Sequence, residues 1–281
     1  MKKVVRALLL LLAATAAFSQ TTPPQPSAKP DGPIQDNSFL LEEAYNQEDG
    51  VIQHISSFQR LFDSKEWVYT FTQEFPVPIQ KHQLSYTVPV VSLPEGIGTG
   101  VGDVMINYRF QAIGTGETRL AFSPRASLIL PTGDYRKGRG AGAVGVQFNL
   151  PFSVVLTDKI VTHWNAGGTI IPGAKNELGE KSRVTGYNLG ASLIYQFNNR
   201  FNAMFETVWT GDESVIGRKE TQRYHELFLN PGIRWAHNFD SGLQIVPGVS
   251  VPIGVGPSSG EKGLLFYVSF EHPWKALFGR R

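Results

Sequence analysis

Residues 186–212 read GYNLGASLIYQFNNRFNAMFETVWTGD, and apolar or aromatic side chains occupy nearly every second position in both halves. The first half runs from Tyr187 to Phe197, and the second from Phe201 to Trp209. Successive side chains leave opposite faces of a strand, so a period of two predicts a β-hairpin. The residues between the halves, NNR, suit its turn. What solvent the apolar face meets depends on the rest of the chain.

The first 19 residues have the pattern of a secretory signal peptide. Basic residues precede an apolar run from Ala7 to Ala14, and the small residues Ala17 and Ser19 follow with the spacing of a cleavage site. A membrane anchor is the alternative, but the run is shorter than the roughly 20 residues of a spanning helix. We therefore expect export and cleavage before Gln20.

Composition and charge narrow the class of protein. Without the signal peptide the chain keeps 26 − 3 = 23 basic residues against 24 acidic ones, so it is nearly neutral and we expect no nucleic-acid partner. Cysteine is absent, which excludes disulfides and thiolate metal sites. No apolar run after the signal is long enough for a membrane helix, whereas a closed β-barrel can span a bilayer because every backbone group is paired.

Strand patterns recur from Gly50 to the C-terminus. We predict an all-β fold, a transmembrane antiparallel β-barrel over residues 50–281 with about twelve strands. The strands are placed at 51–61, 66–75, 82–92, 101–112, 118–130, 143–155, 160–171, 184–197, 201–210, 224–237, 243–253 and 263–272.

The connections between these strands alternate in length. GTGE, TDK, NNR and DSG follow even-numbered strands, whereas long hydrophilic stretches such as PTGDYRKGRGAG and TGDESVIGRKETQR follow odd-numbered ones. Outer-membrane barrels have short periplasmic turns and long extracellular loops. We therefore expect the outer membrane of a Gram-negative-type bacterium, with the apolar face of the 186–212 hairpin against lipid.

Residues 20–49 form a segment of their own before the barrel. Prolines are frequent in 21–33, which predicts an extended periplasmic lead. The stretch NSFLLEEAYNQED at 37–49 predicts a short helix, with Glu42 and Glu43 near its positive N-terminal dipole. This helix either caps the periplasmic mouth of the barrel or enters the lumen as a plug.

A succession of turn motifs resembles a known family. Gly100-Val101-Gly102-Asp103 leads into VMINYRF, and LPTGD at 130–134 is followed by a Gly-rich loop and the strand AVGVQFNLPFSVVL. From about residue 98 to the C-terminus, this succession resembles the outer-membrane transporter-like family named for the MetA pathway of phenol degradation. The resemblance implies a barrel that acts as a channel or transporter for small aromatic compounds. It carries over no substrate-binding residue.

The sequence has no clear catalytic, metal or cofactor motif. Its six histidines lack metal-ligand spacing, and no Gly-x-Ser-x-Gly elbow marks a nucleophile. The glycines of GTGVGD precede a strand rather than a helix, so they do not form a phosphate loop. We expect no enzyme, metal or cofactor. The catalytic alternative is a hydrolase assembled across strands from His163 and a serine.

Alternation directs the polar positions into the lumen. If Val104 and Tyr108 face lipid, their polar neighbours face inward. The lumen-lining candidates are Asp103, Asn107, Arg109, Arg125, Gln147, His163, Glu206 and Glu226. We expect the opposite charges of Arg125 and Glu206, with Arg109 and Glu226, to form a constriction in a narrow pore. The alternative is a closed ion-pair network that only fills the interior.

These patterns lead to three hypotheses about function. The first is an outer-membrane channel or transporter for small, aromatic or hydrophobic molecules. The second is a non-conducting structural or adhesion barrel, and the third is a lipid-modifying outer-membrane enzyme. The expected partners are a small-molecule solute and outer-membrane lipid. The loop with Arg136, Lys137 and Arg139 either contacts lipopolysaccharide phosphates or is simply solvated.

Overall fold

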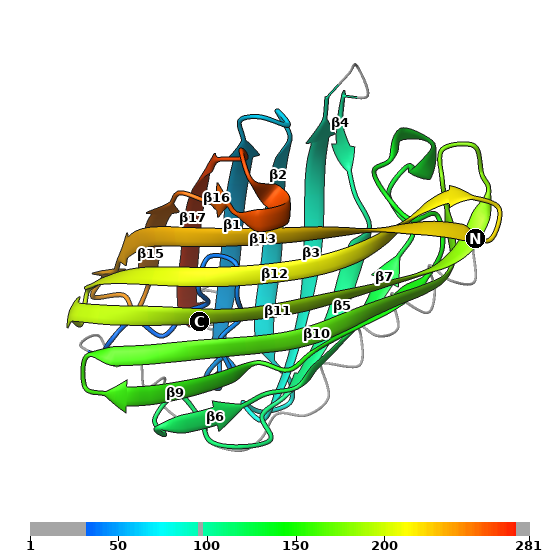
Figure 1. Cartoon of the computed structure of the whole chain (residues 1–281). Coiled ribbons are helices and arrows are strands. Elements are labelled where there is room, and N and C mark those ends of the chain that lie inside the picture. The colour runs from blue at the N-terminus through cyan, green and yellow to red at the C-terminus, as the bar shows by residue number, and fades with distance from the viewer. Residues whose placement is uncertain (1–31, 95–97, 274–281) are drawn as a thin grey trace.

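The computed structural model describes residues 32–94 and 98–273, and the predicted signal peptide and most of the Pro-rich lead lie outside these residues. Its 17 strands form one antiparallel sheet (Figure 1). The first strand, β1 (Val51–Leu61), pairs with both β2 (Trp67–Pro76) and β17 (Gly263–Pro273). The sheet therefore closes into a barrel.

Interruptions account for the difference between 17 strands and the twelve expected. Five short strands continue a neighbour along the same line: β4 (Gly98–Val101) with β5 (Val104–Phe110), β6 (Leu120–Phe122) with β7 (Arg125–Leu130), β8 (Gly145–Asn149) with β9 (Phe152–Thr157), β13 (Glu220–Trp235) with β14 (His237–Asn238), and β15 (Gln244–Ser250) with β16 (Ile253–Gly254). Three breaks contain Pro124, Pro151 and Pro252, which have no N–H for the ladder. The twelve-stranded barrel is confirmed.

The remaining elements are four uninterrupted strands and two short turns of 3₁₀ helix. The strands are β3 (His82–Leu93), β10 (Ile160–Lys175), β11 (Lys181–Asn198) and β12 (Phe201–Gly217), and the helical turns are η2 (Tyr135–Lys137) and η3 (Gly256–Ser258). Among the described residues, no helix is long and apolar enough to cross a membrane.

One predicted long loop is wrong. Most of TGDESVIGRKETQR continues β12 and β13, which pair as far as Gly217 and Glu220 and leave a two-residue turn with Lys219 at φ 63°. Glu213 and Arg223 face each other across this extension and form an ion pair of 3.1 Å. This part of the hairpin extends beyond the apolar part of the wall and has polar residues on both faces. It therefore lacks the apolar–polar alternation by which the other strands were predicted.

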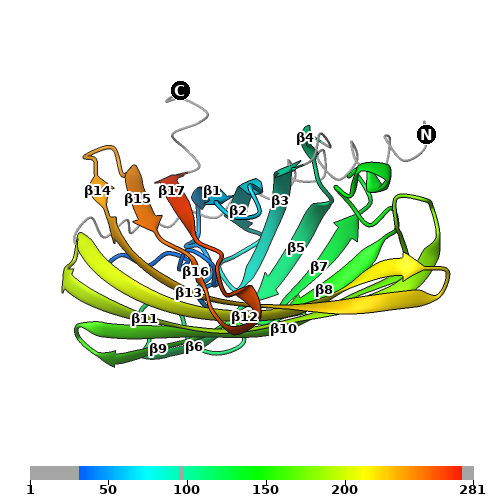
Figure 2. The same cartoon turned by 45° about the horizontal axis from the view of Figure 1, so that its top comes forward.

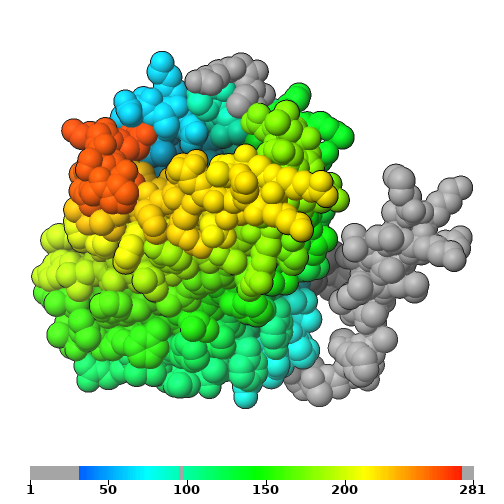
Figure 3. Space-filling view, turned by 45° about the vertical axis from the view of Figure 1, so that its right-hand side comes forward, coloured from blue at the N-terminus to red at the C-terminus, as the bar shows by residue number. Residues whose placement is uncertain are grey.

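The wall of the barrel has an apolar outer face and a polar inner face. On β11 and β12 the outward Leu193 and Phe205 are 52% and 45% exposed, whereas the inward Ser192 and Glu206 are 2% and 0% exposed. Figure 3 shows the outer face of β10–β13 as successive bands from green to yellow. This polarity is the inverse of a soluble core and matches a barrel embedded in lipid.

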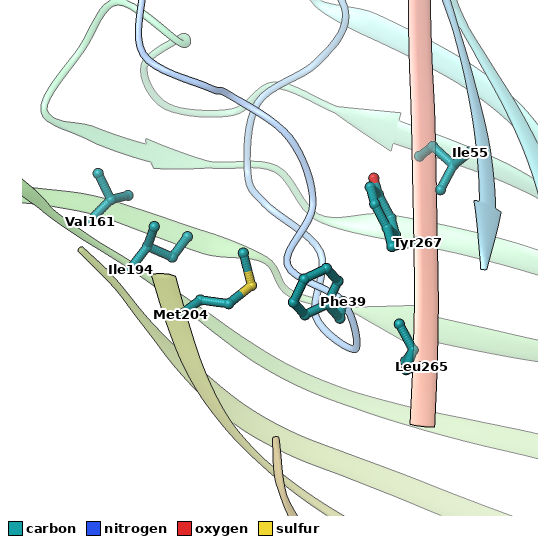
Figure 4. Close-up of a cluster of buried hydrophobic side chains, with 7 residues drawn as sticks. All are labelled: Phe39, Ile55, Val161, Ile194, Met204, Leu265 and Tyr267. Atoms are coloured by element: carbon teal, nitrogen blue, oxygen red, sulfur yellow. The ribbon is translucent and has the colours of Figure 1, made fainter. Parts of the chain in front are cut away.

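The helix predicted for residues 37–49 is absent. This stretch is irregular coil that runs inside the ring of strands and is mostly buried (Figure 2). Phe39 packs at its centre with Met204 and Ile194 on one side and Leu265 and Tyr267 on the other (Figure 4). The amphipathic pattern that suggested a helix thus reflects contacts with the barrel wall. We call residues 36–47 the crossing segment.

Candidate functional site

The crossing segment obtains its backbone hydrogen bonds from side chains of the barrel wall. A buried peptide group without a partner is costly, and an irregular segment has no neighbouring strand to supply one. Five wall side chains accept from its N–H groups: Glu206 from Leu40 (2.9 Å), Asn165 from Glu42 (3.1 Å), Ser153 from Ala44 (2.8 Å), Gln111 from Asn46 (2.9 Å) and Gln83 from Gln47 (2.7 Å). The polar lumen is therefore the binding surface of this segment.

Two buried arginines hold carbonyl groups of the same segment. Arg109 donates to the carbonyl oxygens of Glu43 (3.2 Å) and Tyr45 (2.5 Å). Arg234, from β13, donates to the carbonyl oxygens of Asp36 (2.9 Å) and Asn37 (2.6 Å). Each guanidinium thus spans two peptide groups, and the two together fix the start and the end of the segment.

The expected constriction between Arg125 and Glu206 does not form. Arg125 binds the Glu42 carboxylate, with 2.8 Å from Nη2 to Oε1. Glu206 accepts from the Leu40 N–H and, through its other oxygen, from Asn230 Nδ2 at 2.6 Å. Both charges bind the crossing segment instead of each other, because this segment occupies the space between their strands.

The other predicted lumen residues divide into three groups. Asn107 and Gln147 accept from the Arg125 guanidinium at 3.0 and 2.9 Å and so support its position. Asp103 instead holds a loop, since it accepts from the N–H groups of Gly133 (2.9 Å) and Ala141 (2.7 Å). Glu226 is exposed, on the long-loop side of β13. That any of them contacts a solute stays a prediction.

His163 does have a serine partner, Ser153, but both side chains are buried. Ser153 Oγ lies 2.7 Å from His163 Nδ1 and also accepts from the Ala44 N–H at 2.8 Å. The serine is 0% and the histidine 2% exposed. A nucleophile must reach its substrate, whereas this hydroxyl is covered by the crossing segment.

Two cavities lie on opposite sides of the crossing segment. The loop-end cavity has a volume of about 310 Å³ and reaches from Phe39 and Leu41 along β1–β3. The turn-end cavity has a volume of about 590 Å³ and is bordered by Glu43, Tyr45 and the short turns. The segment therefore separates two hollows within one closed wall.

The family model described as "Putative MetA-pathway of phenol degradation" matches residues 44–270. The chain belongs to this family. The match confirms the resemblance carried by the turn motifs of 100–134, and it begins within the crossing segment. No curated protein is similar enough in sequence to count as a match.

Solved structures with the same fold include an outer-membrane channel and a porin. The COG4313 outer membrane channel from Pseudomonas putida F1 shares 13% identity, with a TM-score of 0.62 over 82% of this chain and 97% of that chain. The NanC porin shares 10% identity, with a TM-score of 0.52 over 77% of this chain and 98% of that chain. At such identities the likeness establishes the barrel fold of this family member and nothing finer.

Sequence reasoning missed the glycines that make room for the crossing segment. A Cβ at Gly232 or Gly248, on neighbouring strands, would lie 2.4 or 2.5 Å from the Phe39 ring, and one at Gly190 would lie 2.4 Å from Leu41. These glycines form a notch into which the segment packs. Their signal in the sequence is a glycine at an inward position of a strand, where a side chain would otherwise point into the lumen.

Proposed function

We propose that this family member is an outer-membrane channel for small molecules and that the crossing segment is its gate. The observation that supports the proposal best is the segment's place between two cavities inside a closed wall. A wall that is apolar outside and polar inside suits a water-filled path through lipid. Passage then requires the segment to move aside.

The bonds that hold the segment favour such a movement. Its backbone is bonded by wall side chains, and neutral hydrogen bonds of this kind contribute about 1 kcal/mol each in net terms, while those to charged groups contribute about 1.5–3 kcal/mol. Side-chain contacts such as the Arg125–Glu42 ion pair add to them. None belongs to the strand ladder that closes the barrel. The segment can therefore leave while the wall stays intact.

The loop-end cavity supports a small ring compound with a polar group as the solute. Phe39 and Tyr267 offer aromatic surface, while Thr70, Thr72 and Ser85 offer hydroxyl groups from β2 and β3. Pockets for small ligands begin at about 300 Å³, and this one lies at that lower limit. A phenolic compound fits the lining and agrees with the family's description.

A reversible cross-link tests the gate. Ser38 and Ser192 place their Oγ atoms 3.0 Å apart, and the chain has no cysteine of its own. In the double variant Ser38→Cys/Ser192→Cys, oxidation should tie the segment to β11 and hold conductance in planar bilayers at background. Adding a reductant to the same channels should restore current, and the wild type under both conditions is the control. Equal currents before and after reduction would show that the segment does not gate.

A deletion of residues 36–47 tests conduction itself. The shortened barrel should conduct more than the wild type, and phenol added on the long-loop side should block the wild-type current reversibly. Folding of each variant is checked by its heat-modifiable migration in gels. If both proteins are folded and silent, the non-conducting structural or adhesion barrel is the better hypothesis.

We do not favour the enzyme, because the Ser153–His163 pair is covered and its hydroxyl already accepts a peptide N–H. The hydrolase hypothesis predicts that Ser153→Ala abolishes an esterase activity of the purified wild type. The channel hypothesis predicts no such activity in either protein.

A further inference from the structure

The lining of the loop-end cavity includes polar side chains that are free to bind a solute. Ser57, Gln59 and Thr70 line this cavity, and their side chains make no hydrogen bond with any other residue that the structure describes. A free polar group in a water-filled cavity is usually hydrated, so this freedom alone indicates no ligand. The arrangement of these side chains on the wall is more informative.

The neighbouring hydroxyls of the cavity are already engaged. The hydroxyl oxygens of Thr72 and Thr87 lie 2.9 Å apart, and Ser85 accepts a hydrogen bond of 3.1 Å from Asn107. A solute hydroxyl at these positions has to compete with bonds inside the wall. At the free side chains it displaces only water.

Two of the free side chains lie in one row with an aromatic ring. Ser57 on β1 is directly opposite Thr70 on β2 and, on its other side, directly opposite Tyr267 on β17. Side chains on one face at such positions have Cβ atoms about 4.5–5.5 Å apart, so both hydroxyls can reach one solute oxygen beside the ring. Gln59 lies one row nearer the loops, opposite Val68.

The surfaces beside this row suit an aromatic solute. The Tyr267 hydroxyl donates to Asp36 Oδ1 (2.5 Å), and its ring packs edge-on against Phe39 with 5.7 Å between the centroids, so the ring is held in place (Figure 4). Val68 is 39% exposed although it lines the cavity. Covering this apolar surface with a ring removes it from water, which favours binding.

The charges of the cavity disfavour an anion. Arg125 is the only cationic side chain among the described residues of the lining, and Glu42 binds it at 2.8 Å. A carboxylate that entered would lose hydration and meet no free positive charge, which is costly. An uncharged hydroxyl loses less hydration.

We propose that Ser57 and Thr70 form the subsite that selects uncharged hydroxy-aromatic solutes. This subsite rests on the proposed function, because it lies on the path assigned to the solute. The solute hydroxyl donates to one of the two side-chain hydroxyls and accepts from the other, since each can do either. A phenol is uncharged at neutral pH, as the tyrosine side chain is with its pKa of about 10, whereas an aromatic carboxylate is an anion.

Calorimetric titration of the purified full chain in detergent tests the pair without requiring a current. The probes are phenol, toluene and benzoate at neutral pH, which share one ring and differ in the group that it carries. The wild type should bind phenol and should not bind benzoate measurably. Partition of a probe into micelles is the same for every variant, so a difference between variants reports the site.

Two substitutions remove the hydroxyls with little change of shape. Ser57→Ala and Thr70→Val should each weaken phenol binding about fivefold, as expected for one neutral hydrogen bond, and the double variant should weaken it about tenfold or more. Toluene has no hydroxyl, so its affinity should not change. Thr70→Ser keeps a hydroxyl and should retain the wild-type affinity for phenol.

Ser56→Ala is the matched control. Ser56 is the next residue of β1 and points to the outer face, where its hydroxyl lies 3.2 Å from that of Tyr69. This variant should bind phenol as the wild type does. Wild-type phenol affinity in the folded double variant, an equal loss of toluene affinity, or benzoate binding as tight as phenol binding would each overturn the proposal.

Conduction in bilayers separates this subsite from the proposed function. A folded barrel that is silent, yet binds phenol through both hydroxyls, would remove the channel and keep the subsite. A conducting barrel whose phenol affinity is unchanged by both substitutions would keep the channel and remove the subsite.

Discussion

The Arg125 guanidinium binds the Glu42 carboxylate through two nitrogens, with 2.9 Å from Nε to Oε1 and 2.8 Å from Nη2 to Oε1. The first residue belongs to the wall and the second to the crossing segment. Asn107 and Gln147 accept hydrogen bonds from the same guanidinium, so wall residues orient the arginine toward Glu42. Among the described residues, it is the only ion pair shorter than 3 Å between the crossing segment and the wall.

We predict that Glu42→Gln loosens the crossing segment. Removing one partner strands the Arg125 charge, and because the pair is only partly buried the cost should be about 1–3 kcal/mol. Conductance should rise and thermal stability should fall. In the double variant Glu42→Gln/Arg125→Gln the loss should be smaller than the sum of the single losses. Additive losses would mean that the two side chains do not act as a pair.

We predict that Gly248→Ala expels Phe39 from its notch. The new Cβ would lie 2.5 Å from Phe39 Cε1, so the ring must move, and overpacking of this kind costs about 1–3 kcal/mol. Gly173→Ala is the matched control, because its nearest atom is 3.7 Å away. The melting temperature and the conductance should change only for Gly248→Ala. Adding Phe39→Ala should relieve the clash. If the double variant loses as much stability as the two single variants together, the Phe39 ring is not what Gly248→Ala displaces.

The outer face of the barrel is predicted to tolerate no charge at mid-height. Leu193→Arg should cost about 2–4 kcal/mol if its position lies near the bilayer midplane. Leu178 is 86% exposed in the loop between β10 and β11, so Leu178→Arg should cost almost nothing. Unfolding by urea in lipid vesicles measures both. Similar costs for the two variants would place Leu193 outside the lipid.

The sequence was sufficient to predict the wall and insufficient to predict what fills it. Alternation placed Leu193 outward and Glu206 inward, because the period of a strand is independent of what lies in the lumen. No comparable local pattern predicts the path of the crossing segment. Its pattern of Leu40, Leu41 and Tyr45 satisfied a helix, but five of its N–H groups are paired by wall residues at least 36 positions away.

The same limit explains the charged residues of the site. Strand parity predicted that Arg125 and Glu206 point inward, and both side chains contact the crossing segment. Their partners could not be found by pairing wall with wall, since both bind residues 40–42 of the segment. The inward glycines were the usable clue, because a strand that gives up a side chain at Gly232 and Gly248 leaves space for another part of the chain.

Glu261 is predicted to make stability depend on pH at the long-loop end, outside the spanning strands. Its carboxylate accepts from the N–H groups of Phe62 (3.1 Å), Asp63 (2.9 Å) and Ser64 (3.0 Å) in the β1–β2 turn. Partial burial raises the pKa of this carboxyl, but the backbone hydrogen bonds outweigh that effect and hold the pKa below its usual value.

A group whose pKa is lower in the folded state stabilises the fold above its unfolded pKa, here about 4.3, and loses that contribution as the pH falls through the folded pKa. Wild type should therefore melt above Glu261→Gln at pH 6, and the difference should shrink as the pH falls below about 4. Glu220→Gln, which changes charge without touching this turn, should show no such trend. A difference between wild type and Glu261→Gln that stays constant from pH 6 to pH 3 would mean that the charge of this carboxylate does not hold the turn.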